Sequence, residues 1–212
     1  MNRIIIFDLD GTLIDSREDL AYAVNLTRAD YGLPPLSLET VVSYVGDGIY
    51  NQMRRGFSDA TFEWDIEEVV AVDRRHYSEH LLDKTIAYPG VVETLARLRS
   101  AFKLAVVTNK PDDCARRILG GLGILPLLDS VVGGGRTEKL KPDPEPLRLA
   151  MTETGSGTEG SWMVGDHRTD LGAAVNTGLK GCFCTYGFGI QDNQPADAVI
   201  DSFPQLADLL LK

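Results

Sequence analysis

Two aspartates close to the N-terminus have the spacing of a catalytic pair. They lie in the segment Asp8-Leu9-Asp10-Gly11-Thr12, directly after an apolar run. A turn at Gly11 would bring both carboxylates to one crevice and leave them at different depths. This arrangement suits a division of labour in which Asp8 attacks a phosphorus atom, while Asp10 first protonates the leaving alcohol and then activates water. The segment therefore predicts phosphoryl transfer through a phosphoaspartate.

A second pair of acids, Asp166 and Asp170, follows a later apolar run. The two residues are one helical turn apart, so both can face the crevice that holds Asp8 and Asp10. Carboxylates gathered in this way repel one another strongly unless a cation lies between them. Oxygen-only ligands with room for water favour Mg2+ over zinc. We therefore predict a Mg2+ site built from these four aspartates.

An anionic nucleophile also needs positive groups around the phosphate that it attacks. Lys141 is the best candidate, because its Lys-Pro-Asp-Pro segment stands just before an expected helix. Thr108 and the backbone N–H groups after it could hold the phosphoryl oxygens. Lys110 and Lys139 are weaker candidates. Each of these residues taken singly has an ordinary surface or capping role, and only their order along the chain favours a site.

Short apolar runs predict the strands that would position these residues. The runs cover residues 4–7, 104–107, 130–132, 162–164, 181–184 and 198–200, and helical patterns at 17–31, 91–101, 111–119 and 143–153 separate most of them. Such alternation indicates an α/β fold with a mostly parallel sheet covered on both faces. Ligands of these sheets bind at the carboxyl ends of the strands. The polar residues that end three of the runs should therefore meet: Asp8 and Asp10, Thr108 and Asn109, and Asp166.

One interval is too long for this alternation. A strand-helix-strand unit takes about 30 residues, yet the first strand ends near Asp8 and the next begins near Lys103. The surplus of roughly 60 residues has helical patterns at 38–45, 49–57 and 66–82. We therefore expect a Rossmann-like parallel-sheet core, residues 1–15 and 84–212, with residues 16–83 inserted as a helical cap.

With these motifs in order, the chain resembles the haloacid dehalogenase superfamily of phosphohydrolases. The matching segments are Asp8-Leu9-Asp10-Gly11-Thr12, Val107-Thr108-Asn109, Lys141-Pro142, and Gly165-Asp166 with Asp170. The resemblance implies that Asp8 is the nucleophile and Asp10 the general acid and base. It implies that Thr108 and Asn109 bind phosphoryl oxygens and that Lys141 pairs with Asp8. Mg2+ would be held by the Asp8 carboxylate, the Asp10 backbone carbonyl and Asp166, with Asp170 close by.

Within the superfamily the chain is most similar to the phosphoglycolate phosphatase branch, through segments at 31–35, 44–48, 88–91, 108–111 and 185–189. The resemblance implies that the loop of residues 46–48 closes over the site and reads the non-phosphate end of the substrate. Gly46, Gly48 and Arg54 are the expected substrate-binding residues, with Arg54 as a possible partner of a substrate carboxylate. His167 and Gly135 depart from the pattern of the branch, at positions that usually carry serine and aspartate.

Composition narrows the choice of partners. The chain has 21 Lys+Arg against 31 Asp+Glu, a formal net charge of -10. A field of this sign repels polyanions, so we expect a small-molecule phosphate ester as ligand and neither nucleic acid nor a membrane. The sequence contains neither a targeting signal nor a membrane span, which favours a cytoplasmic protein, monomer or homodimer.

Alternative functions remain open from the sequence. A phosphatase of the same superfamily could act on a nucleotide, pyrophosphate or a sugar phosphate. A phosphoacceptor signalling domain of receiver type also gathers aspartates and a lysine at strand ends. The long interval after the first strand and the Asp10-Gly11-Thr12 segment disfavour the signalling domain.

Overall fold

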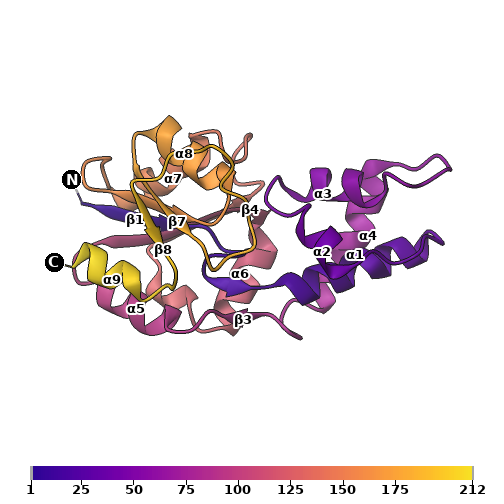
Figure 1. The fold of residues 1–212 in the computed structure, drawn as a ribbon, viewed down its shortest axis with the longest axis horizontal. Coiled ribbons are helices and arrows are strands. Elements are labelled where there is room, and N and C mark those ends of the chain that lie inside the picture. The colour runs from indigo at the N-terminus through magenta and orange to yellow at the C-terminus, as the bar shows by residue number, and fades with distance from the viewer. Residues whose placement is uncertain (1, 212) are drawn as a thin grey trace.

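Six parallel strands form the central sheet of the computed structural model, which describes residues 2–211. Their order is β5-β4-β1-β6-β7-β8 (Figure 1). The strands are β1 (Ile4–Phe7), β4 (Lys103–Pro111), β5 (Ser130–Gly134), β6 (Trp162–Gly165), β7 (Lys180–Cys184) and β8 (Ala198–Ile200). All four residues of β1 are buried, as a central strand covered on both faces requires. The predicted α/β class is confirmed.

Helices cover both faces of this sheet (Figure 1). Ile5 and Phe7 of β1 belong to an apolar cluster with α5 (Val91–Leu98), α6 (Asp112–Gly121) and α9 (Gln205–Leu210). Ile4 and Ile6 point the other way and pack with α7 (Glu145–Thr154) and α8 (Arg168–Thr177). Successive side chains of a strand project to opposite faces. One short run of isoleucines and a phenylalanine therefore anchors two helical layers.

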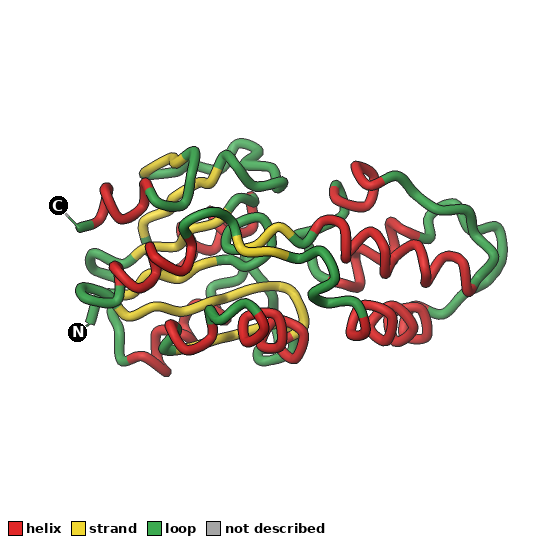
Figure 2. The backbone as a smooth tube through the Cα atoms, turned by 90° about the horizontal axis from the view of Figure 1, so that it is seen from below, coloured by secondary structure: helices red, strands yellow, loops and turns green. Residues whose placement is uncertain are grey.

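Four helices lie together beside the sheet (Figures 1 and 2). They are α1 (Arg17–Asp30), α2 (Leu38–Val42), α3 (Ile49–Gly56) and α4 (Ile66–Glu79). They share a small apolar core that includes Val24, Met53 and Val69. Fully buried Arg28 pairs with Asp59 through two 2.8 Å contacts. These helices are the segment that the sequence predicts as an insertion, and its role as a cap remains a prediction.

A two-stranded antiparallel ribbon joins these helices to the sheet domain. It consists of β2 (Ile14–Asp15) and β3 (Ile86–Ala87), the two points at which the chain enters and leaves the insertion. Buried Asp19, at the start of α1, accepts hydrogen bonds from the backbone N–H groups of Lys84 and Thr85 at 2.8–3.0 Å. The entry and exit segments are therefore held together both by the ribbon and by the hydrogen bonds to Asp19.

The helix predicted at 17–31 is present as α1, and Ser16 at its N-cap makes no side-chain capping hydrogen bond. The Ser16 hydroxyl donates to the Asp10 carboxylate, and Asp19 is occupied by Lys84 and Thr85. Tertiary partners thus replace the local ones. No helix within residues 2–211 is both long and apolar enough to cross a membrane.

Candidate active site

The sheet order brings the predicted motifs to one edge. Strands β4, β1 and β6 are neighbours. Asp8 follows β1, Thr108 and Asn109 lie near the end of β4, and Asp166 follows β6. These residues line one cavity of about 60 Å³ together with residues of the insertion. The position matches the ligand site expected for an open parallel sheet.

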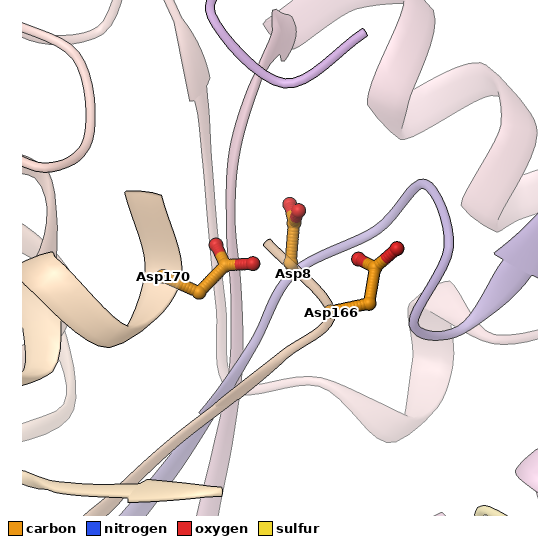
Figure 3. Close-up of side chains that lie close together, drawn as sticks. All are labelled: Asp8, Asp166 and Asp170. Atoms are coloured by element: carbon orange, nitrogen blue, oxygen red, sulfur yellow. The ribbon is translucent and has the colours of Figure 1, made fainter. Parts of the chain in front are cut away.

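Three of the predicted aspartates form a compact cluster. Asp8, Asp166 and Asp170 each offer one carboxylate oxygen, and these atoms lie within 4.8 Å of one another. Asp8 stands between the other two (Figure 3). Burial, with repulsion from Asp170 added, raises the pKa of Asp8 to about 6. Burial and repulsion from Asp170 and Asp8 likewise raise the pKa of Asp166 to about 8. The cluster is therefore short of positive charge.

Lys141 supplies part of that charge. Its buried ammonium lies 2.8 Å from Asp8 Oδ1 and 2.7 Å from Asp170 Oδ1, and it donates to the Val107 carbonyl at 2.7 Å. Burial alone would lower the pKa of Lys141, but Asp170 and Asp8 raise it above its usual value. The lysine therefore stays charged beside Asp8. This contact agrees with the pairing that the family resemblance implies.

The loops around Asp166 hold that carboxylate in place. Asp166 Oδ2 accepts from the backbone N–H groups of Phe188 and Gly189 at 3.0 and 2.7 Å, and Oδ1 accepts from the Thr12 hydroxyl at 3.2 Å. Gly11 has φ +81, and a Cβ built there would meet the Asp166 carboxylate at 2.0 Å. Glycine is therefore required where the turn after Asp10 passes this side chain.

The donor set of the cluster fits Mg2+. All candidate ligand atoms are carboxylate oxygens, the type that this ion prefers. Asp8 Oδ1 is buried and accepts no well-directed hydrogen bond, although it is ion-paired with Lys141. Both oxygens of Asp170 are engaged, by the Lys141 ammonium and by the His167 backbone N–H at 3.0 Å. Both oxygens of Asp166 are hydrogen-bonded too, but only by neutral donors, whereas Asp170 is paired with the Lys141 ammonium. Asp8 and Asp166 are thus the side chains that we favour as direct ligands of the ion.

The carboxylate of Asp10 lies apart from that cluster. It accepts from the Lys110 ammonium at 2.7 and 2.9 Å and from the Ser16 hydroxyl. Burial alone would lower the pKa of Lys110, but Asp10 raises it above its usual value. The structure therefore gives Lys110, only a weaker candidate from the sequence, a direct contact with the predicted acid and base.

Thr108 and Asn109 differ in what they offer a phosphate. The Thr108 side chain lines the cavity, and its hydroxyl oxygen accepts from the Lys110 N–H at 3.2 Å. The Asn109 amide donates to the carbonyls of Gly46 and Lys141 at 2.8 and 3.0 Å and accepts from the Lys141 N–H at 2.9 Å. Its side chain is fully used as a brace between the insertion and the lysine loop. Asn109 could therefore contact a phosphoryl oxygen only through its backbone.

The loop of residues 46–48 reaches the cavity, as the resemblance implies. Gly46 and Gly48 line it beside His167. A Cβ on Gly46, whose φ is +113, would lie 2.8 Å from the His167 ring. Asp47 binds Arg168 at 2.6 and 2.8 Å and Arg55 at 2.6 Å. An ion pair therefore fastens the insertion loop to the sheet domain.

Arg54, the other predicted substrate-binding residue, is not among the residues that line the cavity. It is exposed, and its guanidinium contacts Asn51 at 3.5 Å on the same helix. The helical register of α3 explains this position. Buried Gln52 and Met53 take the inward face, so Arg54 is turned to solvent.

Sequence reasoning missed the inward-facing polar residues of α4. Asp73 and Tyr77 are both buried and line the cavity. Their available signal was the spacing of Val69, Asp73 and Tyr77, which places a carboxylate within an apolar helical stripe.

His167 also has a local structural role. Its ring nitrogen Nδ1 accepts a hydrogen bond from the Thr169 backbone N–H at 3.4 Å, and the backbone N–H of His167 donates to the Asp170 carboxylate. These two bonds form a capping box at the start of α8. Burial and the charge of Arg168 lower the pKa of His167, which favours the neutral ring that can accept this bond.

Comparisons with known proteins agree with this geometry. A family model described as haloacid dehalogenase-like hydrolase matches residues 5–184. A phosphoglycolate phosphatase of Cupriavidus necator, encoded on a plasmid, is 36% identical over 212 residues, which cover 97% of this chain and 92% of that protein. The phosphoglycolate phosphatase of Aquifex aeolicus is 34% identical over 209 residues, with 98% and 96% covered.

A solved structure extends the agreement to the fold. A protein from Haemophilus somnus, described as a predicted phosphoglycolate phosphatase, has a TM-score of 0.91 at 30% identity. The match covers 98% of this chain and 97% of that one. The resemblance seen in the motifs is therefore confirmed over nearly the full length, and the chain belongs to the haloacid dehalogenase-like hydrolases.

Proposed function

We propose that this hydrolase is a Mg2+-dependent phosphomonoesterase that works through a phosphoaspartate on Asp8. One observation carries the proposal. The Asp8 carboxylate is buried at the cavity, paired with the Lys141 ammonium at 2.8 Å, and has Asp166 beside it. A carboxylate held beside a lysine and a possible metal site is suited to attack an anionic phosphate, because the ammonium, and a Mg2+ bound by the acids, would offset the charge repulsion.

In the first step an Asp8 oxygen forms a bond to phosphorus and the bond from phosphorus to the ester oxygen breaks. Asp10, in its protonated form, gives its proton to the departing alkoxide. In the second step Asp10 takes a proton from water, and the water oxygen forms a bond to phosphorus. The bond from phosphorus to the Asp8 oxygen breaks, which releases inorganic phosphate and restores the Asp8 carboxylate. Lys141 remains protonated throughout and holds Asp8 in place. Lys110 and Ser16 orient the Asp10 carboxylate between these two transfers.

Asp8 and Asp166 are the proposed Mg2+ ligands, with the Asp10 backbone carbonyl as the third that the family resemblance implies. The ion would supply positive charge to the phosphoryl oxygens when bound. Asp170 would act on the same site indirectly, because its carboxylate holds the Lys141 ammonium at 2.7 Å.

We propose 2-phosphoglycolate as the substrate, cleaved to glycolate and phosphate. Two relatives that are at least 34% identical over most of this chain carry the name phosphoglycolate phosphatase. The cavity of about 60 Å³ suits a small ester, because each water-sized occupant needs roughly 10–15 Å³ measured in this way. Helices α1–α4 would act as the cap that encloses this ester. A nucleotide or sugar phosphate would require the cap to stand open during turnover.

The test is phosphate release from a panel of small phosphomonoesters, with Mg2+ and with EDTA, by the wild type and Asp8→Asn. We expect Mg2+-dependent release with 2-phosphoglycolate as the best substrate and at least a ~10³-fold loss in kcat for Asp8→Asn, since the nucleophile is removed. Full turnover by Asp8→Asn would overturn the mechanism. An even profile across the panel would overturn only the assigned substrate.

A further inference from the structure

The cavity has a second group of polar residues, which the insertion contributes. Asp73 and Tyr77, four residues apart on α4, project into the cavity together with Gln52 of α3. All three side chains are at most 8% exposed. Polar groups this deeply buried are normally paired with one another or with backbone.

The Tyr77 hydroxyl is an exception to this pattern. Within residues 2–211, only two buried side-chain atoms have no hydrogen-bond partner: Asp8 Oδ1 and the hydroxyl oxygen of Tyr77. Both residues line the same cavity. The first atom belongs to the proposed nucleophile, where the phosphate would bind. The second lies on the cap side, where the remainder of the same molecule would lie.

The surroundings of Tyr77 favour an anionic partner for its hydroxyl. The Lys110 ammonium lies 4.7 Å from the centroid of the Tyr77 ring and is buried. A lysine ammonium can only donate hydrogen bonds, so it leaves the phenolic hydrogen free. Burial raises the pKa of Tyr77 far above its usual value, so the hydroxyl keeps that hydrogen. The same ammonium already binds both oxygens of Asp10, so the Tyr77 hydroxyl is the donor that remains available to a carboxylate at this end.

Other charged groups near this end are already engaged or carry reduced charge. Arg74 lines the cavity, but its guanidinium is turned outward and binds Asp113 at 3.0 and 3.1 Å. Burial raises the pKa of Asp73 to about 7, so its negative charge is incomplete at neutral pH. The Tyr77 hydroxyl is consequently the free donor that faces the cavity from α4.

We propose that Tyr77 is a specificity-determining residue, whose hydroxyl donates a hydrogen bond to a carboxylate carried by the phosphate ester, beside the Lys110 ammonium. The inference rests on the proposed function and deepens it, because it names the group that distinguishes a phosphorylated hydroxy acid from other small phosphate esters.

The test compares two esters that differ only at the distal group, 2-phosphoglycolate and 2-hydroxyethyl phosphate. Tyr77→Phe should lower kcat/KM for 2-phosphoglycolate about 10- to 100-fold, mainly through KM, because a hydrogen bond to a charged group is lost. The same variant should change kcat/KM for 2-hydroxyethyl phosphate less than about threefold. Tyr22→Phe, at an exposed tyrosine that packs on His80, is the matched control and should leave both values unchanged.

Thermal unfolding separates recognition from a structural role. Because the Tyr77 hydroxyl makes no well-directed hydrogen bond within the protein, Tyr77→Phe should unfold at the same temperature as the wild type or higher. A lower midpoint together with equal losses on both esters would overturn the proposal. An unchanged kcat/KM for 2-phosphoglycolate would also overturn it.

A binding measurement keeps the inference separate from the proposed function. If the wild type releases no phosphate from any ester, the proposed function fails, and calorimetry then decides on Tyr77. In the Asp8→Asn background, Tyr77→Phe should weaken binding of 2-phosphoglycolate at least about 10-fold and leave inorganic phosphate unaffected. Equal affinities for 2-phosphoglycolate would overturn the inference alone.

Discussion

At the scale of single residues, the molecule holds carboxylates in two different environments. Asp8 and Asp170 are buried with Lys141 between them, so each keeps an opposite charge within 2.8 Å. Asp73 is also buried, but its one hydrogen bond is a 3.4 Å contact with the Thr27 hydroxyl. Burying a charge without a partner is costly, and a carboxyl in that position binds a proton instead.

Asp73 therefore makes stability depend on pH. Its pKa is raised by burial from 3.8 to about 7, with the charges of His76 and Lys110 opposing that rise. Between these values the native state binds a proton that the unfolded state releases, so unfolding becomes easier as pH rises. Asp73→Asn has no carboxyl group to titrate at this position, so its stability should not fall with rising pH for this reason. We expect the stability of Asp73→Asn, measured as its free energy of unfolding, to rise relative to the wild type by about 4 kcal/mol between pH 4 and 8.

Urea unfolding at a series of pH values measures this difference. Asp208→Asn, at an exposed carboxylate of α9, is the matched control and should show no such trend. A difference between Asp73→Asn and the wild type that stays constant over the range would show that Asp73 is ionised in the native state throughout.

At the scale of elements, three contacts fasten the loop of residues 46–48 to the sheet domain. Asn109 donates to the Gly46 carbonyl, Asp47 binds Arg168, and Gly46 lies against the His167 ring. His167 and Arg168 also begin α8, the helix that carries Asp170. The position of the insertion loop is thus set by the same short segment that arranges the acid cluster.

Gly46→Ala should disturb this contact directly. The added Cβ would lie 2.8 Å from the His167 ring at φ +113, so the loop must move away. We expect kcat/KM to fall about tenfold or more, because small displacements of positioning groups are costly in catalysis. Steady-state kinetics with 2-phosphoglycolate measures the effect. Gly32→Ala, which has φ +71 and nothing within 4 Å, carries similar backbone strain without the collision and should keep its activity.

Strand positions and the core acids could be predicted from the sequence because both depend on local pattern. Apolar runs ended by polar residues identified Asp8, Thr108 and Asp166, and the sheet order brings them together. The ribbon of β2 and β3 could not be predicted, because each strand has two residues and pairs across the whole insertion. The spacing of Val69, Asp73 and Tyr77 indicated one face of α4, but the sequence could not show that this face borders the cavity, since that depends on how α3 and α4 pack.

At the scale of the whole molecule, the net charge does not describe the charge at the site. The chain carries -10 overall, yet Lys110 lines the cavity and buried Lys141 lies 2.8 Å from Asp8, so two lysines partly offset the aspartates there. With Mg2+ added, the proposed site becomes attractive to a small phosphate while the outer surface still repels polyanions.

Removal of the metal should therefore weaken phosphate binding. Calorimetry with inorganic phosphate or orthovanadate should give an affinity at least about tenfold lower in EDTA than in Mg2+, since part of the positive charge at the phosphoryl oxygens is lost. Asp166→Asn should reduce this difference by removing a proposed ligand. Equal affinities of the wild type with and without Mg2+ would contradict the assigned metal site.

The β2–β3 ribbon has a consequence for how such a protein can diversify. Because Ile14 pairs with Ala87 and Asp15 with Ile86, the insertion enters and leaves the sheet domain at adjacent points. None of the six strands of the main sheet lies in the insertion. We therefore expect that a different insertion between the same two points could change the molecule that is recognised while the proposed reaction at Asp8 stays the same.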